Sequence, residues 1–132
     1  MEKIEVIENG IKNNKSCEEI GVNWVFLQAY NDSMEKETKN LNFFRTFGDS
    51  REEKKENSEE IVENLKKFKI KEFTISKNGV NHYILINELI KNGFKLEGES
   101  EIDIKTMDLE EFFKTLQFKE VIEKEKVLKF SI

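Results

Sequence analysis

Few side chains in this chain of 132 residues are of the types that carry out catalysis. There is one histidine, His82, and one cysteine, Cys17. A general base needs an orienting partner and a target, and no spacing supplies either for His82, which we place on the solvent side of a helix. Glu18 and Glu19 follow Cys17 and oppose formation of a thiolate, so we predict a packed thiol. The sequence therefore predicts no catalytic residue and no enzymatic activity.

Cofactor and metal motifs are also missing. The glycines at 79, 93 and 98 do not form a GxGxxG or GxxxxGK pattern, and turns explain each of them. A single cysteine excludes an internal disulfide and a cysteine-based zinc site. We therefore expect no cofactor and no bound metal.

One stretch has a charge pattern that packing does not explain. Between Glu97 and Glu111 there are seven acids and one base, Lys105, a net charge of −6 against −5 for the whole chain. In an extended strand, alternate residues share one face at a spacing of about 6.8 Å. Phosphates of one DNA strand are about 3.4 Å apart, so such a row is a weak mimic of nucleic acid. The candidate partner-binding residues are Glu97, Glu99, Glu101, Asp103, Asp108, Glu110 and Glu111, with the first four on one strand face.

This acidic stretch has three interpretations. It can attract a basic partner protein and accelerate association. It can instead be a solvated strand whose charges protect a sheet edge from pairing. A cation site is the third, but alternate residues of one strand diverge too much to share an ion and no EF-hand spacing exists.

A second candidate site is the turn that opens the central helix, because helix N-termini favour anions. Its residues are Ser76, Lys77, Asn78 and Gly79. A small molecule, such as a nucleotide signal, could bind there. A helix cap with a crossover turn explains the same residues.

Composition limits the other partners. A net charge of −5, with only Arg45 and Arg51 as arginines, disfavours direct binding of nucleic acid and of anionic membranes. Trp24, Phe26 and Tyr30 could stack bases, but no basic residue lies between Lys15 and Lys36, so we predict that they pack in the core. The acidic start carries no secretory pattern and the longest apolar runs have four residues, so we expect a cytoplasmic protein.

Residues 69–97 form the unit around which the other elements are arranged. Residues 71–76 alternate polar and apolar, 79–91 carry a broad helical stripe, and alternation resumes at Phe94. Two strands joined by a helix should run parallel with a right-handed crossover. Asn78-Gly79 is also a hairpin signal, which would make Val80–Asn87 an antiparallel strand instead.

The flanking segments complete an α+β (small α/β) fold in a single domain, residues 1–132. Ser16 to Glu19 has the form of a capping box, and a main helix follows over Val22–Glu37. Gly48–Asn57 is polar and predicts a mobile loop, after which Asn57-Ser58 caps a helix to Phe68. Asp108 begins a short helix. Lys126–Ile132 predicts a final strand antiparallel to the one ending near Ile104, giving a sheet of about three or four strands covered by helices.

Residues 61–104 resemble an uncharacterised family of small proteins from plasmids, conjugative elements and phages of Firmicutes. The most specific resembling piece is the Phe-Thr-Ile-Ser strand at 73–76, and the segment from Lys105 to Lys126 departs from the family, whose members have a shorter hairpin there. The other resembling segments are Glu60–Phe68, the helix end and strand at Asn92–Gly98, Val127–Ile132 and, more loosely, Trp24–Tyr30.

The resemblance brings no known activity and no catalytic residue. It implies an origin in mobile elements, where small proteins often inhibit host machinery. With the acidic stretch, it predicts a non-enzymatic, anti-CRISPR-like inhibitor that occupies a basic, nucleic-acid-binding surface of a host defence protein or nucleoprotein. The alternatives are a protein that binds a nucleotide signal and a structural interaction module.

Overall fold

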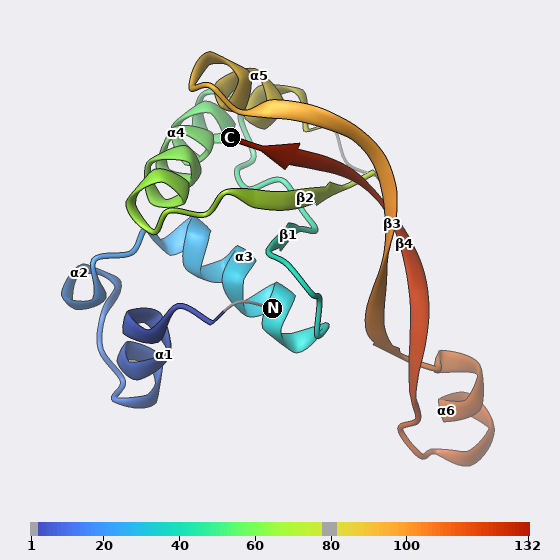
Figure 1. Ribbon diagram of the computed structural model, residues 1–132. Coiled ribbons are helices and arrows are strands. Elements are labelled where there is room, and N and C mark those ends of the chain that lie inside the picture. Colours follow the sequence, from blue (N-terminus) through green and yellow to red (C-terminus); the bar gives the residue numbers. More distant parts are fainter. Residues whose placement is uncertain (1–2, 78–81) are drawn as a thin grey trace.

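The computed structural model describes residues 3–77 and 82–132, and Figure 1 shows the path of the chain. In this part of the chain, helices and strands alternate as an α+β fold. The elements are α1 (Glu5–Lys12), α2 (Cys17–Ile20), α3 (Trp24–Glu35), β1 (Asn42–Phe43), α4 (Arg51–Lys67), β2 (Glu72–Ser76), α5 (Tyr83–Lys91), β3 (Lys95–Met107), α6 (Leu109–Thr115) and β4 (Glu120–Ser131).

The four strands form one mixed sheet in the order β1-β2-β4-β3. Strand β1 is parallel to β2, and β4 is antiparallel to both β2 and β3. The predicted directions are therefore confirmed: β2 and β3 run the same way, joined by α5. The C-terminal strand lies between them, which suits its fully buried Val127 and Phe130. The α5 helix also excludes the alternative hairpin over the described residues 83–87.

Helix α4 begins much earlier than the sequence pattern predicted. Gly48–Asn57 was expected to be a mobile loop, but Ser50 is the N-cap, and its hydroxyl accepts a 3.0 Å hydrogen bond from the Glu53 N–H. Ser58, the predicted cap, lies buried inside the helix and donates to the Lys54 carbonyl at 2.7 Å. Glutamate and lysine favour helix without any apolar period, so the prediction of a loop was wrong.

The two helices near the N-terminus follow the prediction more closely. The Ser16 hydroxyl accepts a hydrogen bond from the Glu19 N–H at 3.2 Å, and the Glu19 carboxylate accepts one from the Ser16 N–H. The predicted capping box is therefore confirmed. Gly21, in the left-handed conformation (φ 80°), ends this short helix. The main helix α3 starts after it at Trp24 and ends at Glu35, two residues inside the predicted range at each end.

The core is built around a cluster of four phenylalanines on the sheet. The Phe73 ring stacks on Phe130 at 5.6 Å between centroids and meets the edges of Phe43 and Phe94 at 5.6 and 5.5 Å. All four side chains are at least 97% buried. Leucines and isoleucines from the helices complete this core: Ile61 and Leu65 of α4, Leu85 and Leu89 of α5, and Ile7 of α1.

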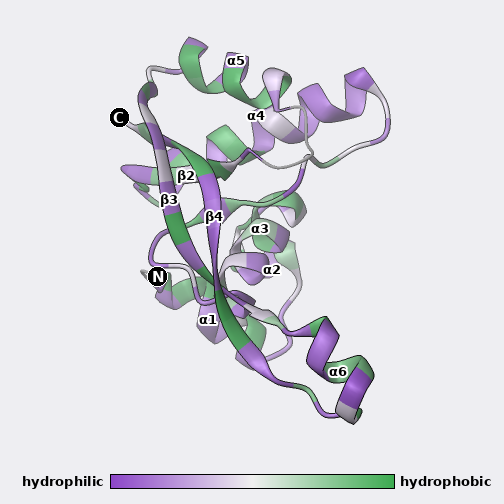
Figure 2. Cartoon of the chain, turned by 90° about the vertical axis from the view of Figure 1, so that its right-hand side faces the viewer, coloured by the Kyte–Doolittle hydropathy of each residue, from purple (hydrophilic) through white to green (hydrophobic). Residues whose placement is uncertain are grey.

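Strands β3 and β4 are much longer than the rest of the sheet and continue past it as a two-stranded ribbon. Their pairing runs from Lys95 opposite Ser131 to Met107 opposite Glu120, and α6 lies in the connection. Strand β2 pairs with β4 only from Val127 onwards. We call residues 97–126 the arm. Figure 2 shows the arm curving down from the body, with α6 at its end. No helix in the described ranges is long and apolar enough to cross a membrane.

Candidate interaction surface

Three of the predicted acids lie where the strand pattern placed them. Glu99, Glu101 and Asp103 are exposed and alternate along β3. The opposite strand, however, supplies lysines to the same surface. Glu101 faces Lys126, and Asp103 pairs with Lys124, whose pKa is raised by that carboxylate. The surface is therefore a pattern of both charges.

Lys77 adds a further positive charge at the base of the arm. Its ammonium group hydrogen-bonds the Glu99 carboxylate, and this contact lowers the pKa of Glu99. The structure thus joins a member of the predicted small-molecule site to a member of the predicted acidic row. An exposed ion pair of this kind contributes little to stability.

Glu97 does not belong to the row on β3. The register passes from Leu96 opposite Phe130 to Gly98 opposite Lys129, so one extra residue is inserted at this point. Gly98 has a φ of +140°, which a glycine adopts without strain. The Glu97 carboxylate accepts a hydrogen bond from the Ser131 hydroxyl. A β-bulge breaks the two-residue alternation, so the predicted row of four carboxylates is a row of three.

The remaining three acids gather at the first turn of α6. The Asp108 carboxylate accepts from the Glu111 N–H at 3.1 Å and caps the helix, as predicted for its start. Glu110 and Glu111 follow in the first turn, where carboxylates suit the helix dipole. Leu116, with φ 59°, ends the helix.

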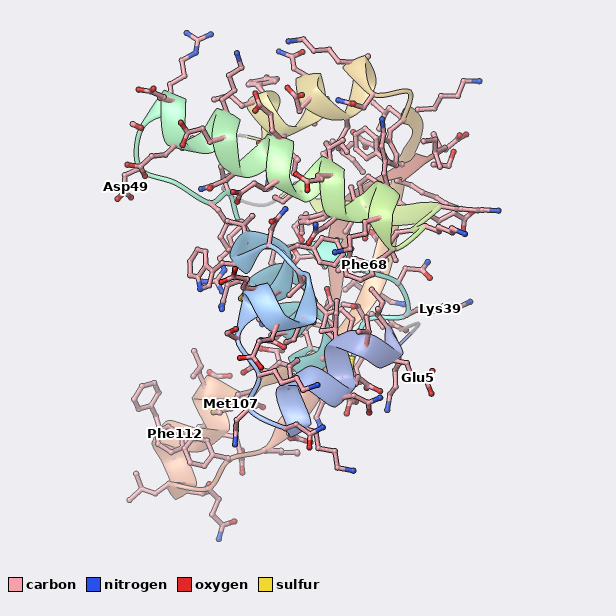
Figure 3. All side chains as sticks on the ribbon, turned by 90° about the vertical axis from the view of Figure 1, so that its left-hand side faces the viewer. Glu5, Lys39, Asp49, Phe68, Met107 and Phe112 are labelled. Atoms are coloured by element: carbon pink, nitrogen blue, oxygen red, sulfur yellow. The ribbon has the colours of Figure 1, made fainter. Side chains whose placement is uncertain are left out.

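Lys105 joins the arm to the body. Its backbone N–H donates to the Lys36 carbonyl at 2.8 Å, directly after α3. Its ammonium group lies 3.0 Å from Glu120 and 3.2 Å from Glu37, and these two carboxylates raise the pKa of Lys105. Figure 3 shows Met107 and Phe112 on the part of the arm that continues beyond this point. Beyond Lys105, the main contacts of the arm among the described residues are those between its own two strands.

The end of the arm exposes large apolar side chains. Phe112 is half-buried and stacks on Phe118 with 4.6 Å between ring centroids, but nothing from the described body covers the others. The sequence shows that this helix has an apolar side, but it does not show that the fold leaves this side uncovered. We call this set the apolar tip: Leu109 (61% exposed), Phe113 (77%), Leu116 (77%), Phe118 (69%) and Ile122 (65%).

The predicted small-molecule site is described only in part, because Asn78 and Gly79 lie outside the described residues. Ser76 is buried and its hydroxyl accepts from the Asn42 side-chain amide at 2.9 Å. That hydroxyl is thus part of an internal network rather than of a ligand site. Among the described residues, no group of three or more histidine, cysteine or acidic side chains could hold a metal ion.

Two predictions about single side chains were wrong. His82 was placed towards solvent, but it is buried, with Nδ1 3.2 Å from the Thr46 hydroxyl, since it precedes α5 on the side that faces the core. Trp24 was placed in the core with Phe26 and Tyr30, but it is 59% exposed and only touches the edge of Phe47. It opens α3, and the stripe that Phe26 and Tyr30 follow turns away from it.

The burial of His82 predicts a pH-dependent stability. Desolvation lowers the pKa of His82, against a smaller opposing effect of the Ser76 backbone, and within the described residues Nε2 has no hydrogen-bond partner. As the pH falls, His82 binds a proton near pH 6.5 in the unfolded chain but only at a lower pH in the folded chain. The free energy of unfolding is therefore highest above about pH 6.5 and decreases as the pH drops below it. We expect the melting temperature to fall between pH 7.5 and 5.5, and to fall less for His82→Gln. Equal slopes for the two proteins would contradict this role.

Comparison with known proteins assigns the chain to a family and no more. No curated protein and no solved structure matches it. A family model, described as a domain of unknown function (DUF7698), matches residues 25–119, which is more than half of the chain and includes β1, β2, α5, β3 and α6. The chain therefore belongs to the DUF7698 family.

Proposed function

We propose that the protein is a non-enzymatic binding protein that docks on a basic partner protein through the arm. The observation that carries this proposal is the arm itself, a long ribbon that leaves a closed core and displays acids along its length. Apart from Ile104, the residues of the arm add no buried side chain to the core. The arm does present a large surface at a distance from the body, as an interaction module requires.

The charge pattern of the arm favours docking on a protein surface with matching charges over simple mimicry of a nucleic-acid strand. Lys124 and Lys77 neutralise Asp103 and Glu99, so the carboxylates do not form an unbroken row like a phosphate backbone. Glu97 and Glu101 are exposed acids that form no ion pair with the described residues, and they give the surface a net negative bias. Mixed patterns select partners by complementarity and suppress wrong ones.

The biological role follows from the resemblance and is part of the same proposal. We propose an origin in mobile elements or phages of Firmicutes, and an inhibitory action on a host defence protein in the cytoplasm. What supports it is the absence of catalytic motifs in this sequence and the acidic surface. The basic surface of a nucleic-acid-binding protein or nucleoprotein is the complement that this surface suits.

A charge-reversal variant tests the docking surface. Glu97→Lys/Glu101→Lys should leave folding unchanged, because both side chains are exposed, and should weaken partner binding at least tenfold at low salt. The matched control is Glu59→Lys/Glu63→Lys on the exposed side of α4, which changes the net charge equally. Binding to a partner captured from host lysate is measured by biolayer interferometry at two salt concentrations.

The control separates a local effect from a global one. Equal loss in both variants would mean that net charge alone attracts the partner, and unchanged binding in the arm variant would exclude the arm's acids as the docking surface.

A further inference from the structure

We propose that the apolar tip is the interface of a homodimer, in which α6 of one copy packs antiparallel on α6 of a second copy. This inference does not rest on the proposed function, which uses acids nearer the body. The apolar tip is the set defined above: Leu109, Phe113, Leu116, Phe118 and Ile122.

The tip is too apolar to be a solvated loop end. Its five side chains are each 61–77% exposed. At roughly 100 Å² for each side chain they offer about 500 Å² per copy, the size of an apolar patch that is often functional in a soluble protein. Two copies would bury about 1,000 Å², near the lower end for a specific interface. The remaining strand residues of the arm would add to this area.

The tip is also held in shape before any partner binds. Phe112 stacks on Phe118 at 4.6 Å and meets Phe113 at 5.7 Å, with planes at 62°, so one half-buried ring supports two exposed ones. A preorganised platform loses less conformational entropy on association than a flexible loop.

The order of charges along the tip favours a second copy as the occupant. Acids stand in the first turn of α6 (Glu110 and Glu111), and Lys114 stands in its last turn. In an antiparallel pair of these helices related by a two-fold axis, the first turn of one copy lies beside the last turn of the other, so Glu110 of one copy lies near Lys114 of the other. An anionic membrane surface would instead be repelled by the acids.

A dimer of this kind is compatible with the acidic surface. Glu97 and Glu101 lie towards the body end of the arm, on the far side of Lys105 from α6. They would stay exposed, and the dimer would carry two copies of that surface.

The first test is the mass in solution. Sedimentation velocity of the full chain from 1 to 200 µM should show a concentration-dependent dimer, and Phe113→Ser/Leu116→Ser should weaken it at least a hundredfold. The matched control, Ile90→Ser/Leu96→Ser, removes two exposed apolar side chains from α5 and the start of β3 and should leave the dimer intact. Unchanged melting curves confirm that the variants fold. A monomer at every concentration, or a dimer that the tip variant retains, would overturn the proposal.

The second test asks whether the partner is another copy in the antiparallel arrangement. Glu110→Lys alone should weaken the dimer about tenfold, and Glu110→Lys/Lys114→Glu should restore it, because the reciprocal pair is rebuilt. Failure of the double variant to recover would overturn the antiparallel pairing. Monomers that bind neutral lipid vesicles or a captured protein through the tip would overturn the homodimer.

Discussion

Replacing Phe73 by alanine is expected to lower the free energy of unfolding by about 3–5 kcal/mol. The ring is 99% buried and touches three other rings, so its removal leaves a cavity that the sheet and its covering helices cannot close. Urea denaturation followed by circular dichroism measures this change, and the m-value shows whether unfolding stays two-state.

The same deletion at the tip of the arm provides the control. Phe113→Ala removes an identical ring that is 77% exposed, and it should change the stability of the monomer by no more than about 0.5 kcal/mol. Phe73→Leu keeps most of the volume and should cost less than Phe73→Ala. A loss below about 1 kcal/mol for Phe73→Ala would mean that the four-ring cluster is not the centre of the core.

Replacing Asn42 by alanine is expected to cost about 2–4 kcal/mol, because it leaves buried hydroxyls without partners. The Asn42 side chain accepts from Thr74 Oγ1 at 2.6 Å and donates to Ser76 Oγ at 2.9 Å, and all three residues are at least 95% buried. Its backbone N–H and carbonyl both bond the Ser33 hydroxyl, at 2.9 and 3.0 Å. This network connects α3, β1 and β2.

A compensating variant distinguishes unmet hydrogen bonds from lost volume. Adding Thr74→Val and Ser76→Ala to Asn42→Ala removes the stranded hydroxyls, so the triple variant should be more stable than the sum of the three single changes predicts. Thermal and urea unfolding of the wild type, the three single variants and the triple variant provide the comparison. Strict additivity would show that the hydrogen bonds of the network contribute nothing beyond packing.

Local pattern was sufficient to predict the elements whose hydrophobic period is clear. Alternation over residues 71–76 and 126–132 predicted β2 and the end of β4, and the apolar spacing over Val22–Glu37 predicted α3. The position of β4 between β2 and β3 was not predictable, because strand order depends on which apolar faces meet in three dimensions. The start of α4 was missed for a different reason: its first two turns carry charges and no apolar period.

The candidate surface was predictable in composition and not in geometry. The acids of β3 and α6 were evident from the sequence, but the lysines beside Glu101 and Asp103 come from residues 20 or more positions away. The bulge at Gly98 separates Glu97 from the row without any signal other than the glycine itself. The apolar tip was visible as a helix face, and only the structure shows that no other element covers it.

Hydrogen exchange of the full chain, free and bound to its captured partner, tests most directly the claim that the arm is the docking surface. Peptides covering residues 95–126 should gain protection in the complex, with α4 unchanged as the internal reference. Slower exchange confined to α1–α4, with the arm exchanging as in the free protein, would contradict the account.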